Sequence, residues 1–162
     1  MNNIRNVTPD DAPAIAQIYN TYVLHSTATF ETVAIDPNTM RKRIQAIFPA
    51  FPYLVYEADG RLLGYAYAHM WKERAAYAHT WESTVYVSPD HLKRGIGSTL
   101  MKELILQCRA RACQALIACI TGNNTPSVLL HQKLGYRQVS CFKQVGNKLG
   151  QTLDVVDLEL LL

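Results

Sequence analysis

The sequence predicts a single α/β domain, residues 1–162, in which helices cover a mixed sheet. Apolar residues recur with helical spacing in some segments and alternate with a period of two in others. Hairpin signals in the middle of the chain are flanked by helical crossovers. A length of 162 residues fits one continuous core, and no linker, repeat or low-complexity segment interrupts it.

The first third predicts a short strand and two helices. Ile4–Val7 alternates as a strand does, and Thr8-Pro9-Asp10-Asp11 has the residues of a capping box that starts a helix. Asp36-Pro37 begins a second helix by the same chemistry. The residues expected on the buried faces of these helices are Ala12, Ile15, Ala16, Tyr19, Tyr22, Val23, Met40, Ile44 and Ile47.

The middle third predicts three strands. Tyr53–Glu57 and Arg61–His69 form an expected antiparallel hairpin that turns at Asp59-Gly60. Met70–Tyr77 mixes charged and aromatic residues and predicts a loop. Thr80–Val87 is rich in β-branched residues and predicts the next strand.

The last third predicts two helices and three strands. They are a helix over Arg94–Ala112, a buried strand over Ala115–Ile120, a short helix over Pro126–Leu134, and strands over Tyr136–Val145 and Thr152–Leu160 around a Gly146–Gly150 turn. The order β-α-α-β-β-β-α-β-α-β-β indicates a layered α/β fold with a mixed sheet.

Composition excludes several functional classes. The formal charge is +3, from 16 basic and 13 acidic residues, without the dense basic stripe typical of nucleic-acid binding. The four cysteines form no C-x-x-C pair or zinc spacing, so we expect reduced, small apolar side chains and no metal. The amino terminus has no signal-peptide pattern and no apolar run would span a membrane, so we expect a cytoplasmic protein without a membrane partner.

A glycine-containing segment, Leu92-Lys93-Arg94-Gly95-Ile96-Gly97, follows a predicted strand and precedes the long helix. A helix amino terminus presents unpaired N–H groups and a positive dipole end, and glycines let an anion approach the backbone. We call this segment the glycine loop and predict an anion site there. It is neither a Walker motif nor a dinucleotide motif, because Leu100 stands where the latter needs Gly or Ala. The motif alone favours tight packing at a helix start over an anion site, so the surrounding residues must decide.

The glycine loop and the order of elements around it resemble the GCN5-related N-acetyltransferase (GNAT) family. Five blocks are similar to the phosphinothricin and methionine sulfoximine N-acetyltransferases of that family. They are Trp71-Lys72 with Arg74 and Tyr77, Glu82 to Ser88, the glycine loop with Ser98-Thr99-Leu100, Pro126-Ser127-Val128, and His131 with Leu134-Gly135-Tyr136. The resemblance runs from Ile4 to the carboxyl terminus. It implies a GNAT fold, with about seven mostly antiparallel strands, about four helices and central strands that splay apart.

The resemblance implies acetyl-CoA as co-substrate. Its pyrophosphate is expected on the glycine loop and its pantetheine arm on the exposed backbone of the preceding strand. The expected cofactor-binding residues are Val85, Tyr86, Val87, Lys93, Arg94, Gly95, Ile96, Gly97, Ser98, Asn124 and Ser127. Without the resemblance, Asn124 is equally well a turn or cap residue. Leu92 departs from the family's Gln or Arg, and we expect only a modest weakening because that position contributes mainly its backbone amide.

Two residues are candidates for proton transfer. An α-amine is mostly protonated at pH 7, so a base is useful, and Glu82 interrupts an apolar strand where an unpaired carboxylate would be costly. Its face is shared with Thr84 and Tyr86 by alternation. His131 stands where many GNAT members have a tyrosine thought to protonate the departing thiolate. A packed or capping histidine is the alternative interpretation.

The acceptor amine is expected near a cationic and aromatic loop. Lys72, Arg74 and Tyr77 are the substrate-binding candidates there, and Phe30 and Glu31 stand where family members place a substrate wall. Arginine can bind oxyanions in bidentate fashion, which suits a carboxylate or a phosphinate. Ala78 replaces an arginine found in some relatives, so recognition of the acceptor carboxylate is expected to differ.

The resemblance thus implies direct acetyl transfer, in a ternary complex, to the α-amine of phosphinothricin, methionine sulfoximine or methionine sulfone, by a homodimer. Acetylation of a peptide amino terminus, a lysine or a polyamine is an alternative, although the basic loop does not favour a polyamine. A non-catalytic acetyl-CoA-binding regulator is another alternative, which the presence of Glu82 disfavours. A nucleic-acid module is disfavoured by the lack of clustered charge and interleaved aromatics.

Overall fold

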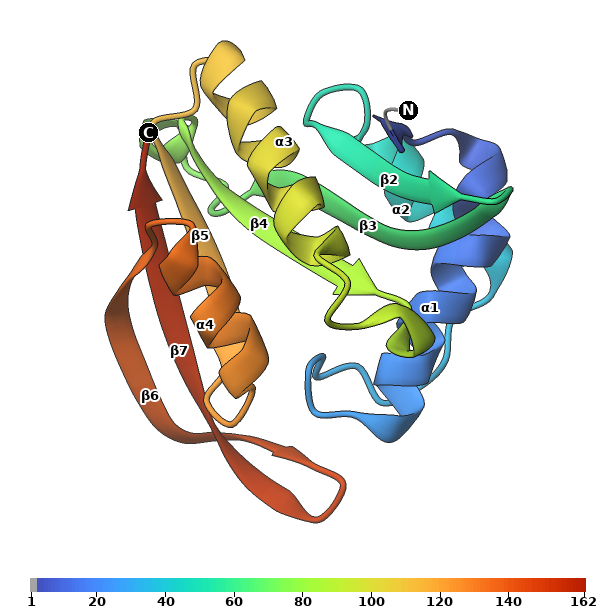
Figure 1. Cartoon of the computed structure of the whole chain (residues 1–162). Coiled ribbons are helices and arrows are strands. Elements are labelled where there is room, and N and C mark those ends of the chain that lie inside the picture. Colours follow the sequence, from blue (N-terminus) through green and yellow to red (C-terminus); the bar gives the residue numbers. More distant parts are fainter. Residues whose placement is uncertain (1–2) are drawn as a thin grey trace.

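A computed structural model describes residues 3–162 (Figure 1). Its helices and strands are β1 (Ile4–Asn6), α1 (Ala12–His25), α2 (Pro37–Ile47), β2 (Tyr53–Ala58), β3 (Arg61–Met70), β4 (Thr80–Val87), α3 (Ile96–Ala110), β5 (Ala115–Thr121), α4 (Thr125–Lys133), β6 (Arg137–Lys148) and β7 (Gln151–Leu161). The strands form one sheet in the order β1-β2-β3-β4-β5-β7-β6. The α/β class and the expected element order are confirmed.

The sheet is antiparallel except between its central strands, β4 and β5. These two pair in parallel over three positions, from Thr80 opposite Ala115 to Glu82 opposite Ile117. Beyond Glu82, β4 continues beside β3 while β5 continues beside β7. The central strands therefore diverge, which confirms the expected splay and leaves one edge of β4 without a strand partner.

Helices cover both faces of the sheet, and each face has its own core (Figure 1). On one face α3 crosses β2, β3 and β4, and its Leu100, Met101 and Leu104 are fully buried. On the other face α1 and α2 pack against tyrosines of β2 and β3. Side chains at alternate positions of β4 therefore enter different cores, so Glu82 and Tyr86 lie on the α1 and α2 side.

The helix starts follow the expected capping chemistry. The Thr8 backbone N–H donates to Asp11 Oδ2 at 2.7 Å, and a short 3₁₀ turn over Pro9–Asp11 leads into α1. Asp36 Oδ1 accepts from the Thr39 backbone N–H at 2.6 Å and caps α2. Both are N-cap arrangements that satisfy otherwise unpaired amides.

Three expectations need correction. The helix α3 begins at Ile96 and not at Arg94, because Lys93 (φ 60°) and Gly95 (φ 78°) are in the left-handed region, which does not continue a helix. The turn between β6 and β7 lies at Leu149-Gly150, whereas Gly146 belongs to β6 beside a bulge. Among the cysteines, Cys119 and Cys141 are exposed, so only Cys108 and Cys113 behave as buried apolar residues.

Candidate active site

The glycine loop places a left-handed residue directly before α3. Gly95 has φ 78° and ψ 0°, and a Cβ built there would meet no atom within 4 Å. The loop side chains Leu92, Lys93 and Arg94 are all exposed. The first amides of α3 have no acceptor inside the helix, so the loop offers N–H groups and two cations to an anion in solvent.

Gly97 has a different role from Gly95. It is helical, and a Cβ there would lie 3.6 Å from Val87 and 3.5 Å from Leu130. A methyl group there would make ordinary van der Waals contacts, so Gly97 marks where α3 lies against β4 and α4. This start of α3 lies beside the end of β4, where the central strands have diverged.

The segment Val85–Val87 has one paired edge and one open edge. Its paired edge matches β3 with Ala66 opposite Val85 and Gly64 opposite Val87. The Tyr22 hydroxyl donates to the Val87 carbonyl at 2.5 Å and anchors this end of β4 to α1. The open edge faces the gap left by β5, so its backbone groups can accept a strand-like ligand.

Glu82 lies at the last pairing position before the strands diverge. Its side chain is 28% exposed, and its Oε1 lies 3.9 Å from His69 Nε2 on the neighbouring strand. Burial raises the pKa of Glu82, the negative charge of Asp157 raises it further, and His69 opposes both. A carboxylate with a raised pKa is suited to proton transfer near neutral pH.

Sequence reasoning missed His69 and Asp157. His69 Nδ1 lies 2.8 Å from the Met70 carbonyl, which can only accept, so Nδ1 holds a proton and Nε2 faces Glu82. Asp157 lies on β7, opposite Cys119 of β5. Both residues are distant from Glu82 in sequence, and strand register alone brings them beside it.

His131 is buried inside the fold. It is 3% exposed and packs edge-on against Tyr136, with ring centroids 5.0 Å apart. Its Nδ1 donates to the Ser127 carbonyl at 2.8 Å, and Nε2 is buried with no hydrogen-bond partner among the described residues. Burial lowers the pKa of His131. The neutral ring thus has its proton committed to its own helix, which favours the packing interpretation over proton donation.

Asn124 and Ser127 lie at the start of α4. Asn124 Oδ1 accepts from the Ser127 backbone N–H at 3.3 Å, so this asparagine is the N-cap of the helix. The cap interpretation of Asn124 is confirmed, and its expected contact with a cofactor stays a prediction. The start of α4 faces the same gap between β4 and β5 as the glycine loop (Figure 1).

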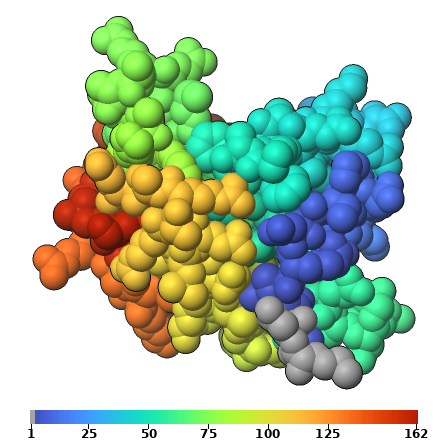
Figure 2. Space-filling model, turned by 90° about the horizontal axis from the view of Figure 1, so that it is seen from above, coloured from blue at the N-terminus to red at the C-terminus, as the bar shows by residue number. Residues whose placement is uncertain are grey.

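The cationic loop forms an open hollow of about 400 Å³ lined by Lys72, Glu73, Arg74 and Tyr77. Lys72 Nζ lies 4.3 Å above the Trp71 ring and 5.3 Å from the Tyr77 ring. The segment that contains these residues projects from the body of the molecule (Figure 2). The structure thus brings the three candidates together, in a hollow whose lining does not include Glu82.

Phe30 and Glu31 are held by contacts within the protein. The Phe30 ring lies so close to Gly146 that a Cβ there would clash, at 2.4 Å. Glu31 accepts two hydrogen bonds from Arg43, at 2.6 and 2.8 Å, and a third from the Tyr19 hydroxyl. The carboxylate of Glu31 is therefore occupied by Arg43 and Tyr19, and its expected contact with a substrate stays a prediction.

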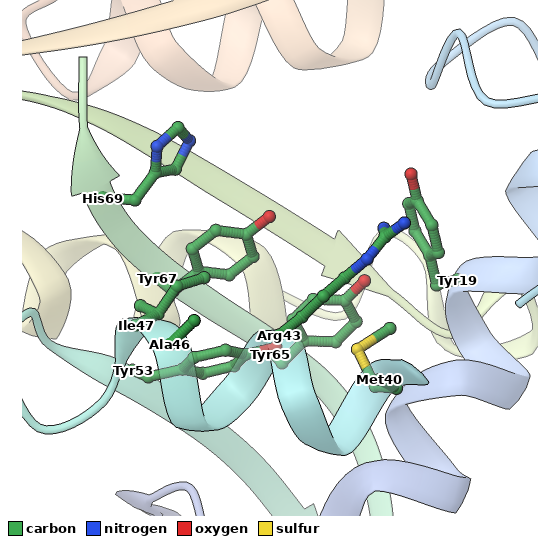
Figure 3. A pocket seen from close by; sticks show the side chains of 9 residues that line it. All are labelled: Tyr19, Met40, Arg43, Ala46, Ile47, Tyr53, Tyr65, Tyr67 and His69. Atoms are coloured by element: carbon green, nitrogen blue, oxygen red, sulfur yellow. The ribbon is translucent and has the colours of Figure 1, made fainter. Parts of the chain in front are cut away.

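A second pocket of about 320 Å³ opens between α2 and β3 (Figure 3). We call it the tyrosine pocket. Its lining residues are Tyr19, Met40, Arg43, Ala46, Ile47, Tyr53, Tyr65, Tyr67 and His69. Sequence reasoning missed it, although the period-two spacing of Tyr65, Tyr67 and His69 already places these residues on one face of a strand.

Residues 15–136 match the model of the Acetyltransferase (GNAT) family. The chain belongs to the GNAT family. The resemblance to this family that was noted from the sequence is thereby confirmed. The diverging strands β4 and β5 and the glycine loop therefore belong to a GNAT fold.

Individual relatives within the family are similar to this chain over most of its length. Phosphinothricin N-acetyltransferase of Alcaligenes faecalis is 43% identical, over 94% of this chain and 79% of that protein. L-methionine sulfoximine/L-methionine sulfone acetyltransferase of Salmonella typhimurium is 33% identical, over 97% of this chain and 92% of that protein. Among solved structures, one similar protein is a GNAT superfamily phosphinothricin acetyltransferase from Sinorhizobium meliloti, in complex with acetyl-CoA. It matches with a TM-score of 0.95 at 33% identity, over 98% of this chain and 87% of that chain.

Two further observations describe this GNAT chain. Across residues 3–162, no group of three or more His, Cys, Asp or Glu side chains is arranged to hold a metal ion. No helix in the same range has the length and apolar character needed to cross a bilayer.

Proposed function

We propose that this GNAT protein transfers the acetyl group of acetyl-CoA to the α-amine of a small amino-acid-like acceptor, of the phosphinothricin, methionine sulfoximine or methionine sulfone type. One observation carries the proposal: the open edge of β4 starts at Glu82 and leads to the glycine loop. A long anionic thioester and a proton acceptor would therefore meet at one point of the sheet. The named relatives act on acceptors of this type.

The residues around the gap fit acetyl-CoA. The pyrophosphate is assigned to the amides of Gly95 to Ser98, with Lys93 and Arg94 supplying positive charge. The open backbone of Val85, Tyr86 and Val87 is assigned to the pantetheine arm, as an added strand. Asn124 and Ser127 border the gap from α4.

Acetyl transfer requires a neutral amine, because a protonated amine has no lone pair for attack on the thioester carbonyl. Glu82 is assigned to remove that proton as the amine is placed for attack, within a ternary complex of enzyme and both substrates. A backbone N–H near Val87 is assigned to stabilise the oxyanion. His131 is assigned to support the wall of the gap, with its unpartnered Nε2 available as an acceptor.

The acceptor is assigned to the side of the sheet that Glu82 faces. Lys72, Arg74 and Tyr77 would supply positive charge and a hydroxyl for its carboxylate, and Phe30 would form a wall. A homodimer is part of the proposal. The exposed Val139, Phe142 and Val145 on the edge strand β6 support it, because apolar side chains along a sheet edge are otherwise a liability in water. Light scattering would measure the mass in solution.

The test is a free-thiol release assay with acetyl-CoA and a panel of acceptors. Turnover is expected with methionine sulfone, methionine sulfoximine or phosphinothricin, and turnover only with peptides, lysine or polyamines would replace the acceptor assignment. Glu82→Gln should lower kcat by at least 100-fold and leave acetyl-CoA affinity within about twofold. Glu103→Gln, on the outer part of α3 beside Gln107, is the matched control. If Glu82→Gln lowers turnover and acetyl-CoA affinity equally, Glu82 has a structural role. If the wild-type protein binds acetyl-CoA but turns over no amine, it is a regulator and not an enzyme.

A further inference from the structure

The tyrosine pocket contains three tyrosine rings stacked side by side. The centroids of Tyr53 and Tyr67 are 4.7 Å apart at 28°, and Tyr65 and Tyr67 are parallel within 1° at 6.3 Å. Figure 3 shows these rings as one wall of the pocket, with Arg43 crossing in front of it. Only Tyr53 and Tyr67 are close enough for ring contact, and the three rings together form an aromatic wall whose polar groups are the hydroxyls.

Two of these hydroxyls have no protein partner. The rings of Tyr53 and Tyr65 are each 2% exposed, and neither hydroxyl forms a hydrogen bond within residues 3–162. Within that range, the one fully enclosed polar side-chain atom without a partner is Nε2 of His131. The hydroxyls of Tyr53 and Tyr65 therefore face the pocket. A hydroxyl in this position favours a ligand that completes its hydrogen bond.

These hydroxyls act as donors. Burial raises the pKa of Tyr53 and of Tyr65 well above the usual value, so both keep their protons at every physiological pH. Tyr67 is also buried, its pKa is raised, and its hydroxyl interacts with Thr84 on β4. The pocket thus offers O–H groups to an acceptor atom and no anion to a cation.

Arg43 adds further hydrogen-bond donors to the pocket. Its guanidinium lines the pocket and donates two hydrogen bonds to Glu31. That pair is partly exposed, and the guanidinium keeps further N–H donors. Because Glu31 already neutralises this guanidinium, Arg43 acts through its remaining N–H donors, from which a ligand oxygen can accept and an ammonium group cannot.

The pocket is connected to the proposed reaction centre. His69 lines it, and His69 Nε2 lies 3.9 Å from Glu82 Oε1. Register places Tyr67 opposite Thr84 and His69 opposite Glu82, so the pocket and the carboxylate share one face of the sheet. An acceptor with its amine at Glu82 would direct its side chain toward Tyr67 and the tyrosine wall.

We propose that the tyrosine pocket binds the tip of the acceptor side chain and selects tips with oxygens on tetrahedral sulfur or phosphorus, as in a sulfone, a sulfoximine or a phosphinate. Such oxygens accept hydrogen bonds from several directions, which matches donors from Tyr53, Tyr65 and Arg43. The proposal rests on the acetyltransferase function proposed above. It assigns selectivity to residues far in sequence from the cationic loop.

The test compares methionine sulfone with norleucine, an acceptor with an unbranched side chain that has no oxygen. In Tyr65→Phe and Tyr53→Phe, the ring remains and only the hydroxyl is lost. Each change should raise the KM for methionine sulfone about 3- to 10-fold, the effect of one neutral hydrogen bond. The kcat/KM for norleucine and the KM for acetyl-CoA should change less than twofold.

Tyr56→Phe is the matched control, because Tyr56 packs on the opposite face of the sheet and its hydroxyl accepts from Asn3 outside the pocket. Equal loss with both acceptors, or no loss with the sulfone, would overturn the proposal. Thermal unfolding midpoints within 2–3 °C of wild type would show that the fold is intact. If one of the two buried changes fails this check, the other variant tests the proposal by itself.

Calorimetry of methionine sulfone binding separates this proposal from the proposed function. If no amine is turned over, the proposed function fails. Weaker sulfone binding in Tyr65→Phe would still support the pocket. Equal sulfone binding by wild type and Tyr65→Phe would overturn it.

Discussion

Replacing His69 with glutamine should move the acid limb of the pH profile to higher pH. In the structure His69 Nε2 lies 3.9 Å from Glu82 Oε1, and its positive charge, when present, lowers the pKa of Glu82. Both side chains are about one third exposed, so the pair is worth up to about 1 kcal/mol. Because 1.36 kcal/mol corresponds to one pKa unit, loss of the cation should raise the pKa of Glu82 by up to about 0.7.

The measurement is kcat/KM for one acceptor between about pH 5 and 9 in the free-thiol assay. The charged base is the active form of Glu82, so a higher pKa means that activity appears at a higher pH. His79→Gln is the control, since its Nδ1 contacts the Ala112 carbonyl and not Glu82. An unchanged limb, or one displaced to lower pH, would refute an electrostatic link between His69 and Glu82.

Three further outcomes follow from the same geometry. Asp157→Asn removes a charge that raises the pKa of Glu82, so the acid limb should move to lower pH in the same assay. Gly95→Ala puts a side chain at φ 78°, so it should lower the free energy of unfolding by about 1–2 kcal/mol in a thermal melt and weaken acetyl-CoA binding. Gly97→Ala, at a helical position where a Cβ has contacts of 3.5 Å or more, should lower the free energy of unfolding less. Leu104→Ala should cost about 2–5 kcal/mol in chemical denaturation, because it leaves a cavity beneath α3.

The sequence predicted the fold well where local chemistry decides the structure. The capping residues Thr8 and Asp36 and the turn at Asp59-Gly60 lie where the sequence predicted them, although α1 itself starts at Ala12, after the 3₁₀ turn over Pro9–Asp11. The errors lie where a boundary depends on backbone conformation. The left-handed Lys93 delays the start of α3, and the left-handed Leu149, a residue that gives no turn signal, moves the last turn away from Gly146.

The two sides of the candidate site differ in how far they could be predicted. The cofactor side is a contiguous motif, and the structure places the glycine loop at the start of α3 beside the open edge of β4. The proposed acceptor side is assembled across strands, with Tyr53 from β2, Tyr65 and His69 from β3, and Asp157 from β7. Strand register brings these residues together. The hairpin of β2 and β3 was predicted, but no local pattern encodes the register that brings Asp157 of β7 to the same face.

This difference has a consequence for the chemistry. In the proposed function the glycine loop acts through backbone amides, which any sequence with the right conformation provides, so we expect the cofactor side to tolerate Leu92 in place of the family's polar residue. The proposed acceptor side would act through side chains: Glu82 lies near the imidazole of His69 and the carboxylate of Asp157, and His69 also lines the tyrosine pocket. A change of one such side chain alters the charge or the donor that an acceptor meets and leaves the backbone in place. Selectivity for the acceptor can therefore change without loss of the cofactor site, and the tyrosine wall is where that selectivity is expected to reside.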